Sequence, residues 1–313
     1  MLTIGTDCSG MEAPIFALRQ LGCPFSHEFA CDKDRHCRTT IEANTRPKQL
    51  FSDITTRPVS SLPRSLDIYV AGFPCQPFST AGLRAGLQDQ RSNIFLHCLA
   101  AIVRTQPKCF ILENVRNLVL HDQGKTWTTI QRHLQHRLKN YHLYHKVLNT
   151  KDFGLPQNRE RLYIVGIRRT RQSRAFEWPD TRRIKLRPLQ QFVDHTDTTS
   201  IPWPYARPCP ANLPPGSLFI AAAFLQKKAS FPNSATIAPC LVTNGTLWCV
   251  PYHRKANVKE YLKLQGFPAS FKQRVSDRQL KKQVGNSMSV PVIKAVLAAA
   301  LRASGLAHHC RRV

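Results

Sequence analysis

The segment 70–79 joins a hydrophobic run to a cysteine that could act as a nucleophile. It has the sequence Val-Ala-Gly-Phe-Pro-Cys-Gln-Pro-Phe-Ser, so a predicted strand leads into a loop in which two prolines flank Cys75. A cysteine held on a rigid loop can attack an electrophile when nearby donors or positive charge stabilise its thiolate. A buried structural thiol is the other interpretation and the commoner fate of cysteine. Position alone leaves both open.

A second segment ends a predicted buried strand on two polar residues, Glu113 and Asn114. The run over 110–115 is Phe-Ile-Leu-Glu-Asn-Val. A carboxylate in such apolar surroundings costs free energy unless it has a partner. Glu113 is therefore predicted to be either a functional acid or one half of a structural ion pair.

The third segment, 157–161, has the sequence Gln-Asn-Arg-Glu-Arg and leads into another predicted strand. Residues two apart on an extended chain point to the same side, so we expect Arg159 and Arg161 to share a face. Two guanidinium groups there could hold a phosphate, a carboxylate or a base carbonyl. They could equally pair with acids at the surface, and the spacing does not decide between these interpretations.

The elements that must position these residues alternate between short apolar runs and longer helical patterns from residue 1 to about 169. This alternation predicts a doubly wound α/β fold with a mostly parallel sheet and crossover helices. The predicted strands are 2–8, 29–32, 66–72, 109–115, 141–148 and 162–167. Periodicity predicts helices at 13–21, 35–43, 94–104 and 127–138. Ligands of such sheets bind beyond the carboxyl ends of the strands, so the residues that follow each strand are the strongest candidates for a site.

The sequence changes character near residue 170. An arginine-rich stretch and the proline-rich segment 201–215 follow, and ordered patterning returns from about 238 to a closing helix predicted at 290–302. We therefore predict an α/β domain at 1–169, a small, irregular, basic region at 170–253, and a C-terminal segment at 254–313 that returns to the first domain.

The charge of the chain is strongly unbalanced. Lys and Arg number 45 against 19 Asp and Glu, which gives a formal net charge of +26. An excess of this size favours nucleic acid as a partner over a basic surface that merely solubilises. An anionic membrane would meet the same charge, but no apolar run reaches membrane-spanning length and the N-terminus lacks the pattern of a signal peptide. We therefore expect a soluble protein with no membrane partner.

Eleven cysteines are scattered from Cys8 to Cys310 without C-x-x-C pairs. An odd number in a long chain predicts reduced thiols in an intracellular protein rather than a disulfide framework. The local metal candidates are Cys31, His36 and Cys37. They have no matching second pair of ligands, so we predict no metal site.

Taken together, the three segments resemble the DNA cytosine-5 methyltransferases. The match consists of the Pro-Cys-Gln loop at 74–76, the Glu-Asn-Val strand end at 113–115 and the Gln-x-Arg-x-Arg segment at 157–161, in the family's order and with similar separations. Further matches are Ser-Asp-Ile at 52–54, Leu-Gln-Gly-Phe-Pro at 264–268 and Gln-Val-Gly-Asn-Ser-Met-Ser-Val-Pro at 283–291. The resemblance covers nearly the whole chain outside roughly 170–235.

The resemblance implies methyl transfer from S-adenosylmethionine to C5 of a cytosine flipped out of duplex DNA. Cys75 would add to C6 of the ring, and Glu113 would protonate or hydrogen-bond N3. Arg159 and Arg161 would bind the base carbonyl and orient the other two groups. The region 170–253 would recognise the target sequence. Further substrate contacts would come from Gln76, Ser79, Asn114 and Gln157.

The resemblance also implies a class I, Rossmann-like methyltransferase fold with the cofactor beside the first strands. Backbone amides of the first strand-to-helix turn would take the methionine carboxylate. Asp32 would hold the ribose hydroxyls, and Asp53 and Ile54 would flank the adenine. The residues implied for the cofactor are Cys8, Gly10, Met11, Asp32, Asp53, Ile54, Pro74, Asn286 and Ser287.

The sequence departs from the family at three places. Glu12 and Ala13 stand where the first turn usually has glycines, and Lys33 stands where an aromatic residue usually follows the ribose acid. These changes bear on the affinity for the cofactor rather than on its identity. The stretch 254–260 lacks the usual Leu-Thr-Pro but keeps Arg254 and Glu260, so we expect this change to be tolerated.

Two alternative functions share this fold. A transfer-RNA cytosine-5 methyltransferase would use the same catalytic groups, but the Cys-Phe-Thr segment of that branch is absent from the sequence. A catalytically weak DNA-binding regulator would account for the altered turn at 10–13. The favoured prediction is a monomeric enzyme that acts on double-stranded DNA in a DNA-containing intracellular compartment, the nucleus in a eukaryote or the cytoplasm and nucleoid in a bacterium. It would serve restriction-modification or epigenetic silencing.

Overall fold

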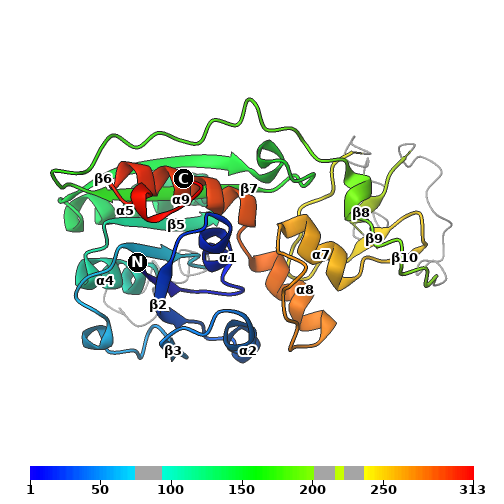
Figure 1. Cartoon of the computed structure of the whole chain (residues 1–313), viewed down its shortest axis with the longest axis horizontal. Coiled ribbons are helices and arrows are strands. Elements are labelled where there is room, and N and C mark those ends of the chain that lie inside the picture. Colours follow the sequence, from blue (N-terminus) through cyan, green and yellow to red (C-terminus); the bar gives the residue numbers. More distant parts are fainter. Residues whose placement is uncertain (75–93, 201–215, 222–235) are drawn as a thin grey trace. The chain divides into compact units, whose positions relative to one another are not determined.

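The computed structural model describes residues 1–74, 94–200, 216–221 and 236–313 (Figure 1). The chain forms two compact units. Unit 1 consists of Met1–Leu148, Glu160–Pro179 and Val292–Val313, and unit 2 consists of Asn149–Arg159 and Asp180–Pro291. The sequence-based division into regions 1–169, 170–253 and 254–313 is a division by function, which these two units do not test, and it stays a prediction.

A seven-stranded sheet forms the centre of unit 1, with the order β3-β2-β1-β4-β5-β7-β6. β1 pairs in parallel with β2 and β4, β2 with β3, and β4 with β5, whereas β7 runs antiparallel to β5. The predicted mostly parallel, doubly wound sheet is thereby confirmed. Its strands are β1 (Leu2–Asp7), β2 (Phe25–Cys31), β3 (Gln49–Phe51), β4 (Ile68–Ala71), β5 (Cys109–Val115), β6 (Tyr141–Asn149) and β7 (Glu160–Arg168).

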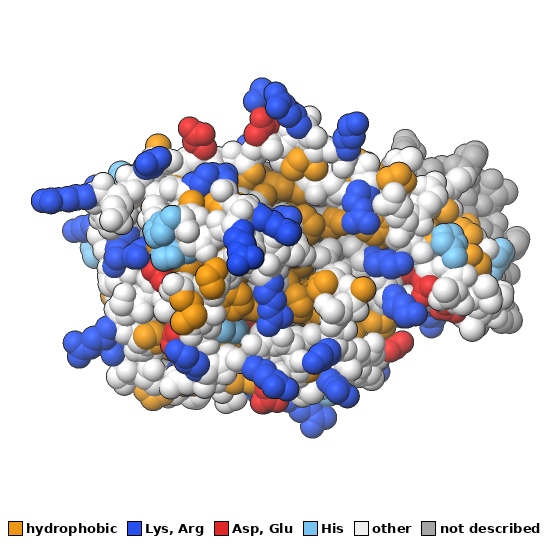
Figure 2. All heavy atoms as spheres, viewed as in Figure 1, with side chains coloured by type: hydrophobic (Ala, Val, Ile, Leu, Met, Phe, Trp, Pro, Cys, Tyr) orange, Lys and Arg blue, Asp and Glu red, His pale blue; other side chains and the backbone are white. Residues whose placement is uncertain are grey.

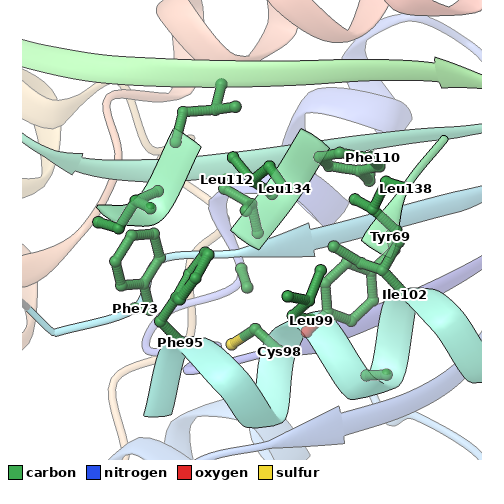
Figure 3. Packing of buried hydrophobic residues seen from close by; sticks show 14 of the residues in the cluster. Tyr69, Phe73, Phe95, Cys98, Leu99, Ile102, Phe110, Leu112, Leu134 and Leu138 are labelled. Carbon is green, nitrogen blue, oxygen red and sulfur yellow. The ribbon is translucent and has the colours of Figure 1, made fainter. Parts of the chain in front are cut away.

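A hydrophobic core fixes α4 (Ile94–Thr105) and α5 (Lys125–Arg137) against the sheet. Phe95 of α4 packs on Phe73, with 5.4 Å between ring centroids, and Leu99 lies beside Tyr69 of β4 (Figure 3). The central strands β4 and β5 are almost entirely buried, which explains their continuous apolar runs. The remaining helices with residues in unit 1 are α1 (Ala13–Gln20), α2 (Arg35–Asn44) and α9 (Val290–Ala303).

The described residues of unit 2 form a three-stranded sheet and two α-helices. The antiparallel strands are β8 (Phe219–Ala221), β9 (Leu247–Cys249) and β10 (Arg254–Lys255), and the helices are α7 (Val258–Gln265) and α8 (Asp277–Asn286). Asn257 and Glu260 begin α7 with a capping box, in which each side chain accepts a hydrogen bond from the other's backbone. Arg254 donates to both carboxylate oxygens of Glu260 at 2.8 Å. The two residues kept at 254–260 therefore pair with each other.

One expectation about the cysteines is wrong. Cys23, after α1, and Cys310, near the C-terminus, form a disulfide. They are 287 residues apart, so no local spacing in the sequence could indicate the pair. The backbone brings them together, because the amide of Arg312 donates to the carbonyl of Leu21 at 3.1 Å. Among the described residues, Cys8, Cys31, Cys98, Cys109, Cys240 and Cys249 are free thiols.

Basic side chains are spread over the visible surface, with few acidic ones among them (Figure 2). In the part of the chain that the structure describes, no single helix has both the length and the apolar composition to cross a bilayer. α8 and α9 meet those two criteria only when taken together, and they are bent by 40° at the break between them.

Candidate active site

The ends of β4 and β5 bring two of the predicted segments side by side. Ala71 lies opposite Leu112 in the parallel register, so the residues after β4 run beside Glu113 and Asn114. Asn114 is 3% exposed, and its Nδ2 donates to the carbonyl oxygen of Phe73 at 2.8 Å. Its Oδ1 accepts from the Val115 amide at 2.8 Å. Asn114 thus fixes the chain two residues before Cys75.

Pro74 is the last described residue of this stem and is exposed. Cys75, Gln76 and Ser79 lie outside the described residues, so their predicted contacts stay predictions.

Glu113 and Arg161 form an ion pair across two antiparallel strands. The register sets Arg161 of β7 opposite Val115 and Tyr163 opposite Glu113. Arg161 and Glu113 are therefore diagonal neighbours on one face of the sheet. Arg161 Nε lies 3.4 Å from Glu113 Oε1, and the side chains are 16% and 7% exposed. A guanidinium so close reduces the cost of burying a carboxylate.

Arg159 belongs to unit 2 and binds backbone carbonyls. Its side chain donates to the carbonyl oxygens of Leu241 at 2.7 Å, Gly285 at 2.9 Å and Ser287 at 2.7 Å. Only 1% of Arg159 is exposed. Because β7 begins at Glu160, Arg159 precedes the strand, and the two-residue repeat that predicts a shared face with Arg161 does not extend to it.

Gln157 is completely buried beside Arg159 in the same unit. Its Nε2 donates at 2.8 Å to both the Leu264 carbonyl and Gln265 Oε1. Gln265 Nε2 in turn donates to the Ser287 carbonyl at 2.7 Å. Three motifs found in the sequence, 157–161, 264–268 and 283–291, thus share one buried hydrogen-bond network, called the Arg159 hub below. It comprises Gln157, Arg159, Gln265 and the carbonyls of Leu241, Gly285 and Ser287.

Asn286 and Ser287 lie at the C-terminal end of α8, which the Arg159 hub holds through the carbonyls of Gly285 and Ser287. Ser287 is buried and its carbonyl accepts from Arg159 and Gln265, whereas Asn286 is exposed. Their predicted contact with a cofactor stays a prediction.

The turn after β1 has an unusual backbone. Every second residue is left-handed: Cys8 has φ 50°, Gly10 has φ 54° and Glu12 has φ 59°. Hydrogen bonds within the protein hold this shape, because the amide of Ser9 donates to the Cys31 carbonyl, that of Gly10 to Asp32 and that of Glu12 to the Ser9 carbonyl. A Cβ built on Gly10 would meet no atom within 4 Å, so the turn is open on that side. Met11, only 1% exposed, anchors the turn in the core.

Asp32 is tied to the same turn. Its Oδ2 accepts from the Gly10 amide and its Oδ1 from the Asp34 amide, at 2.8 and 2.9 Å. Burial raises the pKa of the Asp32 carboxyl, and these two hydrogen bonds oppose the rise. The structure therefore brings Asp32 and Gly10 together, as expected for neighbouring parts of one site.

Asp53 and Ile54 follow β3. Asp53 Oδ2 lies 3.3 Å from Lys33 Nζ, and Asp53 Oδ1 accepts from the Thr55 amide and hydroxyl at 2.8 and 2.7 Å. Burial opposes the change, but the bonds from Thr55 and Lys33 lower the pKa of Asp53. Ile54 is part of the hydrophobic core. Lys33, a departure from the family, thus has a partner in this segment.

A buried network beneath the turn has no motif in the sequence. Arg57 donates to both oxygens of Asp7, at 2.6 and 2.9 Å, and the Tyr69 hydroxyl donates to Asp7 Oδ2 at 2.7 Å. The guanidinium also stacks on Phe29 and Phe51, 5.2 and 5.1 Å from the ring centroids. Burial raises the pKa of Asp7, whereas Arg57 and Tyr69 lower it. Arg57 lies 50 residues from Asp7 in an irregular segment, so no motif signals the pair.

The comparisons with known proteins agree with this geometry. The chain matches the family model described as C-5 cytosine-specific DNA methylase over residues 8–202 and 226–302. It is 33% identical to the Type II methyltransferase M.NgoBI of Neisseria gonorrhoeae over 92% of this chain and 89% of the relative. It is 36% identical to M.NlaX of Neisseria lactamica over 90% of this chain and 88% of that relative.

Among solved structures, the S. pombe Dnmt2 methyltransferase superposes with a TM-score of 0.70 at 18% identity, covering 96% of this chain and 98% of the other. This likeness concerns the fold, which is that of an α/β methyltransferase. The matches over nearly the whole sequence identify the family. The chain belongs to the C-5 cytosine-specific DNA methylases and is a DNA (cytosine-5-)-methyltransferase. The predicted family and enzyme class are confirmed.

Proposed function

We propose that this enzyme methylates C5 of a flipped-out cytosine in double-stranded DNA, through a covalent bond between Cys75 and C6 and with S-adenosylmethionine as donor. The observation that carries the proposal is the hydrogen bond from Asn114 to the Phe73 carbonyl. It ties the stem that leads to Cys75 to the strand end that holds Glu113, beside Arg161. A nucleophile, an acid and a cation would thus meet at one edge of the sheet.

The proposed chemistry begins with the Cys75 thiolate. Its sulfur adds to C6, and the electron pair of the C5–C6 double bond moves to C5 as an enamine. Glu113, once it has taken up a proton, donates that proton or a hydrogen bond to N3 and stabilises this intermediate. S-adenosylmethionine supplies an electrophilic methyl group when it is bound. After C5 has taken the methyl group, it loses its proton to a base, the C5–C6 double bond reforms and Cys75 leaves as thiolate. N3 returns to Glu113 any proton that it received.

The two arginines have different parts in this proposal. Arg161 orients Glu113 and binds the base carbonyl. Arg159 and Gln157 act as positioning residues, because their polar atoms are engaged inside unit 2. Gln76 and Ser79 would contact the substrate from the Cys75 loop.

The residues around the first turn fit the proposed cofactor. The turn is open on the side of Gly10, which leaves room for a ligand, and Asp32 presents acceptors beside it. These residues would hold the amino-acid and ribose parts of the cofactor. The adenine and the remaining contacts are assigned to Met11, Asp53, Ile54, Pro74, Asn286 and Ser287.

The net charge of +26 supports a DNA partner. Extraction of a base costs unstacking free energy, and contacts with the flanking phosphates offset it. We propose a monomer that acts where DNA is present in the cell. The similarity to enzymes named Type II methyltransferases supports a place in restriction-modification.

A tritiated-methyl assay tests the activity and its substrate together. The wild-type enzyme with labelled S-adenosylmethionine should transfer label to duplex DNA and leave transfer RNA unlabelled. Label on transfer RNA alone would replace the DNA proposal with the sister activity. Absence of label on either would reject the proposed donor or the catalytic assignment, and equilibrium binding of the donor separates those two outcomes.

The covalent step has its own test. Duplex DNA with 5-fluorocytosine at the target should form a denaturation-resistant adduct with the wild-type enzyme, because fluorine cannot leave as a proton does. Cys75→Ala should form no adduct and show no turnover, yet keep its affinity for DNA. More than a trace of activity in Cys75→Ala would contradict the mechanism.

A further inference from the structure

A buried glutamate occupies the turn proposed to bind the cofactor. Glu12 is 0% exposed and has φ 59°, a left-handed conformation that disfavours residues other than glycine. It stands where the family usually has glycine, and glycine would adopt this backbone conformation at lower cost in free energy. The contacts of the Glu12 carboxyl group must therefore offset the cost of the left-handed conformation and the cost of burying the group.

The Glu12 carboxyl is anchored on residues of β1 and β2. Thr6 Oγ1 donates to Glu12 Oε1 at 2.7 Å and lies 3.2 Å from His27 Nε2. His27 Nε2 is itself 3.6 Å from Glu12 Oε1. The Ser9 hydroxyl donates to Thr6 Oγ1 at 2.9 Å and accepts from the Cys31 amide at 3.2 Å. We call Thr6, Ser9, Glu12 and His27 the turn cluster. It links the cofactor turn to both neighbouring strands.

Charges of both signs face the turn cluster. Asp7 at the end of β1, which pairs with Arg57, and Asp32 after β2 disfavour the ionisation of Glu12, whereas Arg19 of α1 favours it. Arg19 of α1 and Glu28 of β2 act on His27 and oppose each other there. Burial raises the pKa of Glu12 to about 8 and lowers the pKa of His27 to about 4. Near pH 7 both side chains are therefore uncharged, because the Glu12 carboxyl is protonated and the His27 ring is a neutral imidazole.

We propose that Glu12 is a positioning residue whose neutral carboxyl group, held by Thr6 and His27, keeps the turn in the shape that binds the cofactor. Loss of its proton sets a buried negative charge against Asp7, Asp32 and the cofactor's own carboxylate, and it weakens cofactor binding. The inference rests on the proposed donor and adds a pH-dependent step to it.

The direction of the pH dependence follows from the two shifts. Glu12 binds its proton more tightly in the folded protein than its ordinary pKa of 4.5 implies. Its contribution to stability is therefore complete below pH 4.5 and is lost as the pH rises through about 8. His27 behaves oppositely, because its pKa falls from 6.5 to about 4, and its contribution is lost as the pH falls through 4.

Equilibrium titration with S-adenosylhomocysteine from pH 6 to pH 9.5 tests the proposal without turnover. For the wild type, the Kd should rise about tenfold or more as the pH passes 8, a coupling of ordinary size between two sites. Glu12→Gln keeps the shape of the side chain without the acid, so its Kd should stay nearly constant. Glu12→Gly accepts the left-handed backbone and should also be insensitive to pH, which keeps the test open if Glu12→Gln folds poorly.

Glu42→Gln is the matched control. It removes one exposed carboxylate from α2. Its pH profile should follow the wild type. Infrared spectra of the unliganded wild type should also show a protonated carboxyl band at pH 7 that fades above pH 8 and is missing in Glu12→Gln.

The outcomes separate the two proposals. Binding that is tight and independent of pH in the wild type would overturn the role of Glu12 and leave the donor in place. A pH dependence that persists in both Glu12 variants would overturn it as well. Absence of binding at every pH would overturn the proposed donor, and the role of Glu12 with it.

Discussion

Arg159 and Arg161 are two residues apart, yet they serve two different regions of the molecule. Arg161 in unit 1 lies 3.4 Å from Glu113, and the two side chains are 16% and 7% exposed. Arg159 in unit 2 is 1% exposed and donates to three backbone carbonyls. One guanidinium contacts the carboxyl group proposed as the catalytic acid, and the other supports backbone structure.

The boundary between the two regions is the start of β7 at Glu160. After this point the antiparallel register with β5 decides what each side chain meets, and it delivers Arg161 to Glu113. Just before Glu160 the chain belongs to unit 2, and Arg159 donates to the carbonyls of Leu241, Gly285 and Ser287. Identical residue types therefore acquire different functions from the element they occupy.

The largest expected effect is that of Glu113→Gln on catalysis. The substitution keeps the size of the side chain but removes the acid, so the rate of methyl transfer should fall by about 10²–10⁴-fold. Single-turnover kinetics on duplex DNA measures this rate. Thermal unfolding should stay close to the wild type, and an unchanged rate would contradict the proposed role.

Arg159→Ala should damage stability rather than chemistry. Three buried carbonyls would lose their charged donor, so the free energy of unfolding should fall by about 3 kcal/mol or more. Urea denaturation followed by circular dichroism gives this value. A loss below 1 kcal/mol would mean that the Arg159 hub does not stabilise unit 2, and the contrast with Arg161 would fail.

Arg161→Ala should show the reverse pattern. The Glu113 carboxyl would lose its neighbour, so methyl transfer should slow by about tenfold or more. The free energy of unfolding should fall by about 1–2 kcal/mol, less than for Arg159→Ala, because one contact of a buried charged group is lost rather than three hydrogen bonds. Arg161→Lys keeps the charge and should recover part of the rate. A stability loss as large as that of Arg159→Ala would erase the distinction between the two arginines.

Much of the fold follows from local patterns in the sequence. The buried strands β1, β4, β5 and β7 and helices α1, α2, α4, α5 and α9 lie close to their predicted positions, because apolar periodicity is strong there. β3, β8 and β9 have three residues each and β10 has two, so they leave no such pattern. The Cys23–Cys310 bond escaped prediction because only the tertiary path of the chain brings the two residues together.

The sequence motifs predicted which residues belong to the candidate site, but not which residues their side chains contact. The strand end at Glu113 and Asn114 and the pairing of Asp32 with the first turn follow from the α/β topology. The partner sets of Arg159 and Gln157 do not, because they depend on where β7 begins and how unit 2 folds. Glu12 was visible as a departure from the family, but its contacts with Thr6 and His27 require the register of β1 and β2.

The smallest expected effect concerns Glu160, which separates the two arginines. Its carboxylate lies 2.6 Å from Arg116 Nη1, but the two side chains are 39% and 58% exposed. Water and salt screen such a pair, and ordering two long side chains costs entropy, so Glu160→Gln should change the free energy of unfolding by about 1 kcal/mol at most. Methyl transfer should be unaffected, because the charge of Arg161 and its register opposite Val115 remain. Urea denaturation and single-turnover kinetics on the same preparation check both statements. A strong loss of activity would mean that the surface pair helps to set the start of β7, and with it the separation of Arg159 from Arg161.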